Sequence, residues 1–449
     1  MTGKQFNQLT RTALIISLFA GLSACSGGLF GGGDKKTTPT VGERVPVLSR
    51  FESGAKVDPD LAGVAVVLPP AQTNSDWSQG GGNAAKSNGH VTLAENPAAA
   101  WKVTIAGSTN RRRLASAPVI GGGVMVAVGT DGVVSAFDAQ TGARRWTYQM
   151  KVDDKLENSA FGGGASYAAG RLYATNGVGD VAALDAETGA EIWKVKPAGP
   201  LRGSPTLAFN TVFVMTQNNE IISLSAVDGS NQWQESGSSA QAGVFGVASP
   251  AAAQGTIIAG YSSGELSAYR YENGQSLWSD ALSRTSISTE VGALTDIDAD
   301  PIIDQGRVYA LGQGGRMAAY ELVTGQRIWE LNLAGISTPA IAGEWVFTLT
   351  DDARLLAIAR ATGKVRWISQ LPQYRKPKKK TDPIFWTGPV LAGGQLWVAS
   401  TEGQIYRVSV GEGSASLYLD IKAAVSVAPI VANNTLYILD DSGTIHAFR

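Results

Sequence analysis

Residues 131–146 read DGVVSAFDAQTGARRW, and variants of this stretch recur along the chain. Each full copy has a short apolar segment, a turn that contains glycine, and an aromatic residue four positions after that glycine. The other full copies are GDVAALDAETGAEIW from 179, NEIISLSAVDGSNQW from 219, GELSAYRYENGQSLW from 264, GRMAAYELVTGQRIW from 315 and ARLLAIARATGKVRW from 353. GQIYRVSVGEGSASL from 403 keeps the turn but has Leu417 in place of the aromatic residue, and GTIHAF from 443 ends before its turn. Because the copies return every roughly 40 to 50 residues, the sequence predicts one array of blades rather than several domains.

A second pattern, a proline followed by a turn and two apolar residues, precedes each copy. The prolines are Pro118, Pro205, Pro250, Pro301, Pro339, Pro389 and Pro429, with Ala165 in the second copy. Proline cannot donate to a strand ladder, so we expect these residues on the innermost edge strand of each blade. Each unit then supplies four strands, and four-stranded units repeated radially form a β-propeller. The prediction is an all-β, eight-bladed propeller over residues 91–449.

The last copy lacks a fourth strand, because the chain stops one residue after Phe448. The segment AAAWKVTI at 98–105 has the character of a fourth strand but no glycine turn before it. We expect it to pair with the C-terminal blade, which closes the ring and removes an open edge. The tryptophans of the copies are expected to fill the space between blades: Trp146, Trp193, Trp233, Trp278, Trp329 and Trp367.

Composition excludes several classes of function. The 37 lysines and arginines nearly balance the 38 aspartates and glutamates, which argues against a nucleic-acid partner. The only cysteine is Cys25, and the only histidines are His90 and His446, so little material exists for a zinc site or a histidine-based catalytic centre. The chain also lacks a GxSxG elbow and a GxxxxGK phosphate loop. We expect no catalytic residues, no metal and no cofactor.

Residues 1–24 read as a secretory signal with a basic start and an apolar run at 13–22, too short to span a bilayer. The following Leu-Ser-Ala-Cys resembles a bacterial lipobox, which predicts lipidation of Cys25. The alternative is an ordinary signal peptide with a chance cysteine. Residues 25–40 are rich in glycine and polar residues and predict a flexible acylated tether. We interpret residues 41–90 as a partly ordered N-terminal arm, with an entry loop around Trp77.

In a propeller, the connectors between blades and the glycine turns lie on opposite faces. The glycine turns are nearly uniform in length, but the connectors vary, and variable loops on a rigid scaffold commonly carry binding groups. We therefore place the working surface on the connector face. Two cationic clusters, at 111–113 and at 375–380, are expected there, either as solvated loops or as contacts for lipid head groups or an acidic partner.

The repeats resemble the tryptophan-docking repeats of quinoprotein dehydrogenases and of the BamB family, lipoproteins of the β-barrel assembly machinery. The lipobox, GERVPVL, DWSQGGGN and the RRRL connector together resemble BamB proteins of alphaproteobacteria. The resemblance implies a non-enzymatic scaffold that is lipid-anchored in the outer membrane and faces the periplasm. It further implies docking on the periplasmic POTRA domains of BamA, and help in folding and inserting barrel proteins, whose unfolded precursors are a further candidate partner.

The same resemblance implies that the partner-binding residues lie on two connectors. These are Leu201 and Arg202 before the third blade, and Asp296 and Asp298 before the fifth. Two rival functions remain open. One is a quinoprotein dehydrogenase that uses pyrroloquinoline quinone. The resemblance implies that such enzymes commonly carry a pair of adjacent cysteines, and this chain has only one cysteine. The other is a periplasmic glycan-binding propeller that uses exposed aromatic residues such as Trp77 and Trp386.

Overall fold

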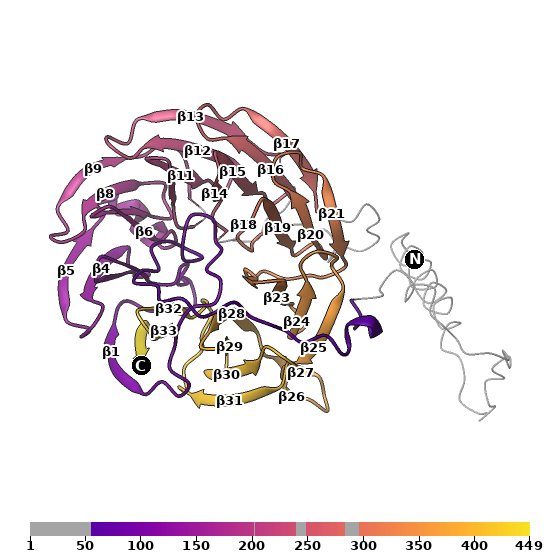
Figure 1. Ribbon diagram of the computed structural model, residues 1–449. Coiled ribbons are helices and arrows are strands. Elements are labelled where there is room, and N and C mark those ends of the chain that lie inside the picture. The colour runs from indigo at the N-terminus through magenta and orange to yellow at the C-terminus, as the bar shows by residue number, and fades with distance from the viewer. Residues whose placement is uncertain (1–54, 202, 239–247, 283–295) are drawn as a thin grey trace, which may run out of the picture. The chain divides into compact units, whose positions relative to one another are not determined.

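A computed structural model describes residues 55–201, 203–238, 248–282 and 296–449. Within these ranges the chain forms eight four-stranded antiparallel sheets arranged as a ring of blades, with a small two-stranded sheet added (Figure 1). The predicted eight-bladed propeller is confirmed. In this part of the chain no helix is long and apolar enough to cross a membrane. The short 3-10 helices are η2 (Pro59–Leu61) and η3 (Asp154–Ser159).

Blades 1 to 4 each contain four strands that follow one another in the chain, from the innermost to the outermost. They are β2 (Val119–Gly121), β3 (Val124–Val128), β4 (Val133–Asp138) and β5 (Arg144–Gln149); β6 (Ala165–Ala168), β7 (Arg171–Thr175), β8 (Val181–Asp185) and β9 (Glu191–Val195); β10 (Thr206–Ala208), β11 (Thr211–Met215), β12 (Glu220–Ser225) and β13 (Asn231–Ser236); and β14 (Ala251–Ala253), β15 (Thr256–Gly260), β16 (Glu265–Arg270) and β17 (Ser276–Ala281).

Blades 5 to 7 repeat this order, and blade 8 departs from it only in its fourth strand. They are β18 (Ile302–Asp304), β19 (Arg307–Gly312), β20 (Arg316–Glu321) and β21 (Arg327–Leu331); β22 (Ala340–Ala342), β23 (Trp345–Leu349), β24 (Arg354–Ala359) and β25 (Val365–Gln370); β28 (Trp386–Ala392), β29 (Gln395–Ser400), β30 (Gln404–Ser409) and β31 (Ala415–Asp420); and β32 (Ile430–Ala432), β33 (Thr435–Leu439), β34 (Thr444–Phe448) and β1 (Ala99–Thr104).

The ring closes as the sequence predicts. Strand β1 pairs antiparallel with β34, so that Ala99 lies opposite Phe448 and Thr104 lies opposite Thr444. In the second strands of the blades nearly every residue is buried, and most third strands are buried in their middle positions, although β30 is mainly half-buried; outer strands such as β5 are exposed or half-buried. This burial follows from packing each blade face to face with its neighbours, which covers both faces of the middle strands.

The repeat tryptophans join each blade to the next. Trp329 of blade 5 donates its indole N–H to the carbonyl of Arg360 in blade 6, at 2.9 Å. Its ring also lies against Gly363, where an added Cβ would come within 2.9 Å of the ring. Seven tryptophans sit in this way on the turn glycine of the following blade: Trp101 on Gly142, Trp146 on Gly189, Trp193 on Gly229, Trp233 on Gly274, Trp278 on Gly325, Trp329 on Gly363 and Trp367 on Gly413. The predicted packing role of the tryptophans is confirmed.

Leu417 takes the corresponding position in blade 7, and the structure explains the exception. In the other blades, the tryptophan packs on the turn between the third and fourth strands of the next blade; we call this turn the tryptophan seat. In blade 8 these strands are β34 and β1, which are not consecutive in the chain, so no turn joins them. Leu417 is accordingly half exposed.

The described part of the N-terminal arm, residues 55–90, runs with the three residues that follow it from the outer strand of blade 6 to the centre of the ring (Figure 1). At the centre it bonds to the free edges of the innermost strands. These contacts are Trp77 with Ile120, Ser78 with Tyr167, Gln79 with Leu207, Ala84 with Ala252, Ala85 with Ile303, Val91 with Leu391 and Asn74 with Asn433. With its contact to Val365 on the outer strand of blade 6, the arm bonds to all eight blades. Trp77, expected in an entry loop, is buried against β2.

Candidate functional site

A pocket of about 420 Å³ lies at the centre of the ring. The innermost strand of each blade starts on the connector face and runs toward the face of the glycine turns. The wall of the pocket is formed where these innermost strands start. Seven of the residues that directly precede a blade proline line it: Ala117, Ser204, Ser249, Asp300, Thr338, Gly388 and Ala428. The arm contributes Trp77, Lys86 and the glycines at 80 and 81. The arm bonds to residues farther along the same strands, so it lies beneath this wall, toward the glycine turns.

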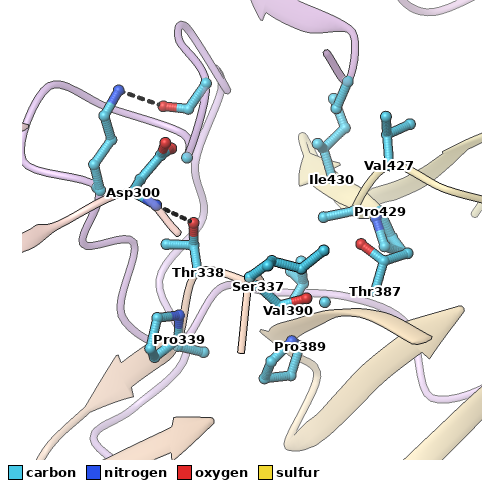
Figure 2. Close-up of a pocket in the computed structure, with 18 of the residues that line it drawn as sticks. Asp300, Ser337, Thr338, Pro339, Thr387, Pro389, Val390, Val427, Pro429 and Ile430 are labelled. Carbon is cyan, nitrogen blue, oxygen red and sulfur yellow. Dashed lines mark hydrogen bonds between the residues drawn. The ribbon is translucent and has the colours of Figure 1, made fainter. Parts of the chain in front are cut away.

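The pocket has a polar side and an apolar side, as Figure 2 shows. Blades 3 to 5 contribute serines and the carboxylates of Asp298 and Asp300. Blades 6 to 8 contribute mainly apolar groups, among them Pro339, Val390 and Val427. A pocket divided in this way suits a ligand with one apolar part and a few hydrogen-bonding groups.

A base and an acid, Lys86 and Asp300, are buried near each other on the polar side, beside Gly81. Lys86 is 2% exposed and Asp300 is 9% exposed. The Lys86 ammonium donates to the carbonyl of Gly80 at 2.7 Å and to the hydroxyl of Thr206 at 3.2 Å. The Asp300 carboxylate accepts from the main-chain N–H of Ser249 at 2.6 Å. Lys86 therefore ties the arm to β10, and Asp300 ties the connector of blade 5 to that of blade 4.

Burial dominates the protonation behaviour of both groups. It lowers the pKa of Lys86 below its ordinary value, and the nearby Asp300 carboxylate partly offsets this effect. Burial raises the pKa of Asp300, against the opposing influence of Lys86 and the Ser249 amide. Both shifts follow from the cost of removing a charge from water. The pair fixes the polar side of the pocket, and its hydrogen bonds go to the protein itself.

Leu201, expected to contact a partner, is buried in this chain. It is 1% exposed, packs in the apolar cluster between blades 2 and 3, and forms an antiparallel bridge with Thr216. The preceding carbonyl, of Pro200, accepts from the N–H of Gln217 at 2.8 Å. Arg202 lies outside the described residues. The structure thus shows how this connector is attached to blade 3, and partner binding through it stays a prediction.

Asp296 and Asp298, the other predicted pair, are also buried. The carbonyl of Asp296 accepts from Gln313 at 2.8 Å, which attaches the connector to the turn between β19 and β20. Between the two aspartates, Ile297 is fully buried against Gly260 of blade 4. Of the three predicted residues that the structure describes, only Asp298 lines the central pocket.

Sequence reasoning missed the pocket and its buried base and acid, although a signal for Asp300 exists. Asp300 is the only charged residue that directly precedes a blade proline, a position held elsewhere by alanine, serine, threonine or glycine. The expectation of exposed aromatic residues for a glycan site is wrong, because Trp77 and Trp386 are both buried. Trp386 stacks on Tyr406 with ring centroids 5.0 Å apart and donates to the carbonyl of Pro372.

Several protein families share this propeller architecture, and comparison with known proteins shows to which of them the chain is similar. A family model described as outer membrane protein assembly factor BamB matches residues 85–159 and 130–369, more than half of the chain. The chain belongs to the BamB family. A BamB of Yersinia pestis is 26% identical over 359 residues, which cover 79% of this chain and 89% of that relative. A BamB of Escherichia coli K12 is 25% identical over 355 residues, covering 78% and 88%.

Solved structures that share this fold include proteins outside the BamB family. The crystal structure of BamB from Moraxella catarrhalis superposes with a TM-score of 0.64 at 22% identity, covering 78% of this chain and all of that one. A quinohemoprotein alcohol dehydrogenase from Comamonas testosteroni gives a TM-score of 0.65 at 14% identity, covering 88% and 82%. At these identities the likeness concerns the propeller alone, so the fold does not choose between assembly factor and enzyme.

Proposed function

We propose that the chain is a non-enzymatic scaffold subunit of the outer-membrane β-barrel assembly machinery, where it assists the folding and insertion of β-barrel proteins. The observation that carries this proposal is the match of the BamB family model through residues 85–369, most of which fold as the blades described above. The fold suits the task because eight blades, joined by tryptophan contacts and by the arm, hold a set of connectors on one rigid face.

We infer that the connectors entering blades 3 and 5 dock on the periplasmic POTRA domains of BamA. Leu201 and Asp296 are buried and would hold these connectors in position. Arg202 would supply charged hydrogen bonds to the partner, the stronger kind in protein interfaces, whereas Asp298, which is 6% exposed, would help to hold its connector. The two connectors stand two blades apart in a ring of eight, so a partner domain that spans about a quarter of the ring could contact both.

We further propose that the chain is anchored by lipid on Cys25, which lies outside the described residues, and faces the periplasm from the outer membrane. Several acyl chains on one residue would hold the protein firmly, since each buried methylene contributes about 0.8 kcal/mol. Labelling with radioactive palmitate should modify the wild-type chain and leave Cys25→Ser unlabelled. Equal labelling of both proteins would contradict this anchor.

The function and its site can be tested together by affinity purification from cell envelopes in detergent. Tagged wild-type chain should retain a BamA-like barrel protein, and Arg202→Glu should retain much less of it. Lys102→Glu, at an exposed position on the closing strand β1 at the rim of blade 8, is the control for the change in charge and should behave as wild type. Loss with Arg202→Glu alone supports both function and site. Retention by all three proteins refutes the site, and absence of the barrel protein from all three refutes the function.

The rival enzymatic function has its own assay. We expect no alcohol or aldose oxidation by the purified chain after addition of pyrroloquinoline quinone and calcium, measured by reduction of a dye acceptor. Turnover that depends on the quinone would overturn the scaffold proposal.

A further inference from the structure

We propose that the connector face over blades 6 and 7 binds an acidic polypeptide segment, which places one large apolar side chain in the mouth of the central pocket. This surface lies across the pocket from the connector entering blade 3 and beside the connector entering blade 5, whose Asp300 donates its main-chain N–H to Thr338 at 3.0 Å. The inference goes beyond the assembly function, because it concerns a second surface and does not require BamA as the partner.

The first observation is a pair of exposed apolar side chains at the mouth of the pocket. Ile336 is 50% exposed and Phe385 is 58% exposed, and both line the pocket. Phe385 directly precedes β28, and Ile336 stands a few residues before β22, so both belong to the apolar side. Single exposed apolar residues are common, but two at the edge of an apolar concavity mark a surface that gains by being covered.

The second observation is a cationic hairpin on the same connector as Phe385. Strands β26 (Tyr374–Lys376) and β27 (Thr381–Pro383) pair antiparallel, and Figure 1 places the hairpin beside β31 at the rim of the ring. The N–H of Ile384 donates to the carbonyl of Gln373 at 2.8 Å, which closes the hairpin directly before Phe385. The cationic tip and the apolar edge are therefore parts of one continuous connector.

The charge of this hairpin is only partly neutralised. Arg375 pairs with Glu402 at 2.5 Å, and Lys376 pairs with Asp382 at 2.8 Å. Lys378, Lys379 and Lys380 are exposed and form no ion pair with any other described residue. Three adjacent cations of this kind favour an acidic partner by charge complementarity.

The lining of the pocket decides the orientation of the bound segment. An acidic side chain against the apolar wall from blades 6 to 8 would be buried without a partner, which is costly, and the Lys86 ammonium on the polar side is already bonded to Gly80 and Thr206. The acidic side chains of the partner therefore lie over the hairpin, and its apolar side chain enters the pocket. The hydroxyls of Ser337, Thr338 and Thr387 at the pocket wall can bond to the partner's main chain. A concave pocket beside a charged rim favours a polypeptide over a flat bilayer.

Binding can be measured by fluorescence anisotropy with the full chain and a short fluorescein-labelled peptide, in which glutamates flank one central phenylalanine. We expect binding that falls about tenfold or more with Phe385→Ala, and likewise with the combined change of Lys378, Lys379 and Lys380 to glutamate. Replacing the central phenylalanine of the peptide by serine should weaken binding to a similar extent.

Matched variants control for each change. Val323→Ala removes an apolar side chain that is 73% exposed beside a glycine turn, on the other face, and should leave binding unchanged. Changing the exposed Lys56, Lys102 and Lys196 to glutamate alters net charge equally and should also leave binding unchanged. Equal loss in these controls, or equal binding of the serine peptide, would overturn the proposal. The proposal would also be overturned if the chain bound phosphatidylglycerol vesicles through the three hairpin lysines and did not bind the peptide. Because the assay contains no BamA, its failure is distinct from failure of the affinity purification.

Discussion

The contact between a tryptophan and the turn glycine of the next blade can be tested with two glycines of the same backbone conformation. Gly363 and Gly306 both have φ of +74°, in the left-handed region that disfavours residues with a Cβ. A Cβ at Gly363 would lie 2.9 Å from the Trp329 ring, whereas at Gly306 nothing lies within 4 Å. The two alanine substitutions therefore share the backbone cost and differ in the clash.

The magnitudes follow from these geometries. Alanine in the left-handed region costs about 1 kcal/mol, which is the whole effect expected for Gly306→Ala. Overpacking against a rigid ring adds about 1–3 kcal/mol, so Gly363→Ala should lower the free energy of unfolding by about 2–4 kcal/mol. Urea unfolding followed by circular dichroism measures both values.

A double-mutant cycle removes the remaining ambiguity. Trp329→Ala alone should cost about 3–5 kcal/mol, because a large buried ring is lost. In that background Gly363→Ala should cost only about 1 kcal/mol, since the ring that it would strike is gone. Equal costs for the two glycine variants, or additive costs in the cycle, would refute the claim that the tryptophan seat depends on glycine.

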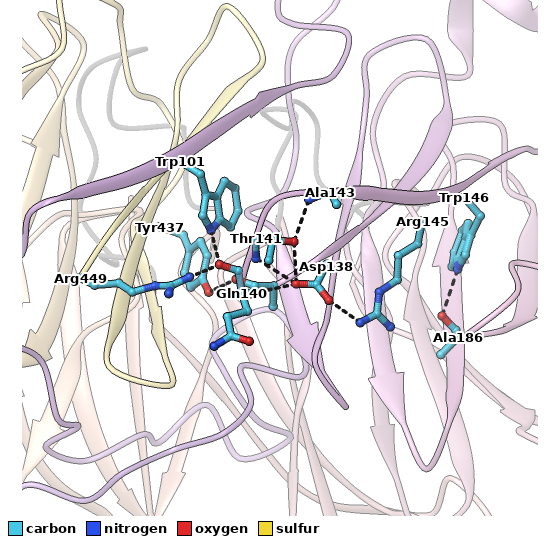
Figure 3. Close-up of polar contacts among 11 residues, drawn as sticks. Trp101, Asp138, Gln140, Thr141, Ala143, Arg145, Trp146, Ala186, Tyr437 and Arg449 are labelled. Carbon is cyan, nitrogen blue, oxygen red and sulfur yellow. Dashed lines mark hydrogen bonds and ion pairs between the residues drawn. The ribbon is translucent and has the colours of Figure 1, made fainter.

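Three further predictions concern the turn, the arm and the exceptional leucine. Arg145 and the turn amides hold the pKa of Asp138 at about 2, below the ordinary 3.8, so its carboxylate stabilises the fold above pH 3.8 and this contribution is lost as the pH falls through about 2 (Figure 3). Asp138→Asn should accordingly cost roughly 1–2 kcal/mol at neutral pH and much less near pH 2, and equal costs in urea unfolding at both would contradict this. Gln79→Ala removes two buried bonds to the main chain of β10 and should cost about 2–4 kcal/mol while speeding trypsin cleavage of the arm; unchanged cleavage would show that the arm does not depend on them. Leu417→Trp should change the unfolding free energy by less than about 0.5 kcal/mol, whereas Trp367→Leu should cost about 2–4 kcal/mol, and a large gain from the first would mean that blade 8 offers a seat after all.

The sequence was sufficient to predict the blades and the closing strand, because their signals are local and repeated. Each copy carries its own turn glycine and its own tryptophan, and Figure 3 shows the result where Trp101 of the closing strand donates to the carbonyl of Gln140 in blade 1, as Trp146 does to Ala186 in blade 2. Residues 98–105 could be recognised as an unpaired fourth strand because they match the fourth strand of the other copies.

The course of the arm and the central pocket could not be predicted in this way. The arm bonds to the blades mainly through its backbone, as in the bond from Tyr167 to the carbonyl of Ser78, and a backbone bond leaves no mark on residue type. The pocket is assembled from residues of the arm and of seven blades, so its composition emerges only when the ring is closed. At the predicted docking connectors, Leu201 and Asp296 stood out by family resemblance, but only the structure shows that their side chains are buried.

The closing of the ring has a consequence for the order in which the chain folds. Ala99 meets Phe448 across β1 and β34, so 448 − 99 = 349 positions separate the two partners of this pair. Contacts between such distant parts of a chain form slowly, because the entropy of closing a long loop must be lost before the pairing can compensate. The arm faces the same delay, since it bonds to innermost strands as far apart as β2 and β32. The segments made first in synthesis are thus the last to dock, and until then the edge of β34 remains open to intermolecular pairing.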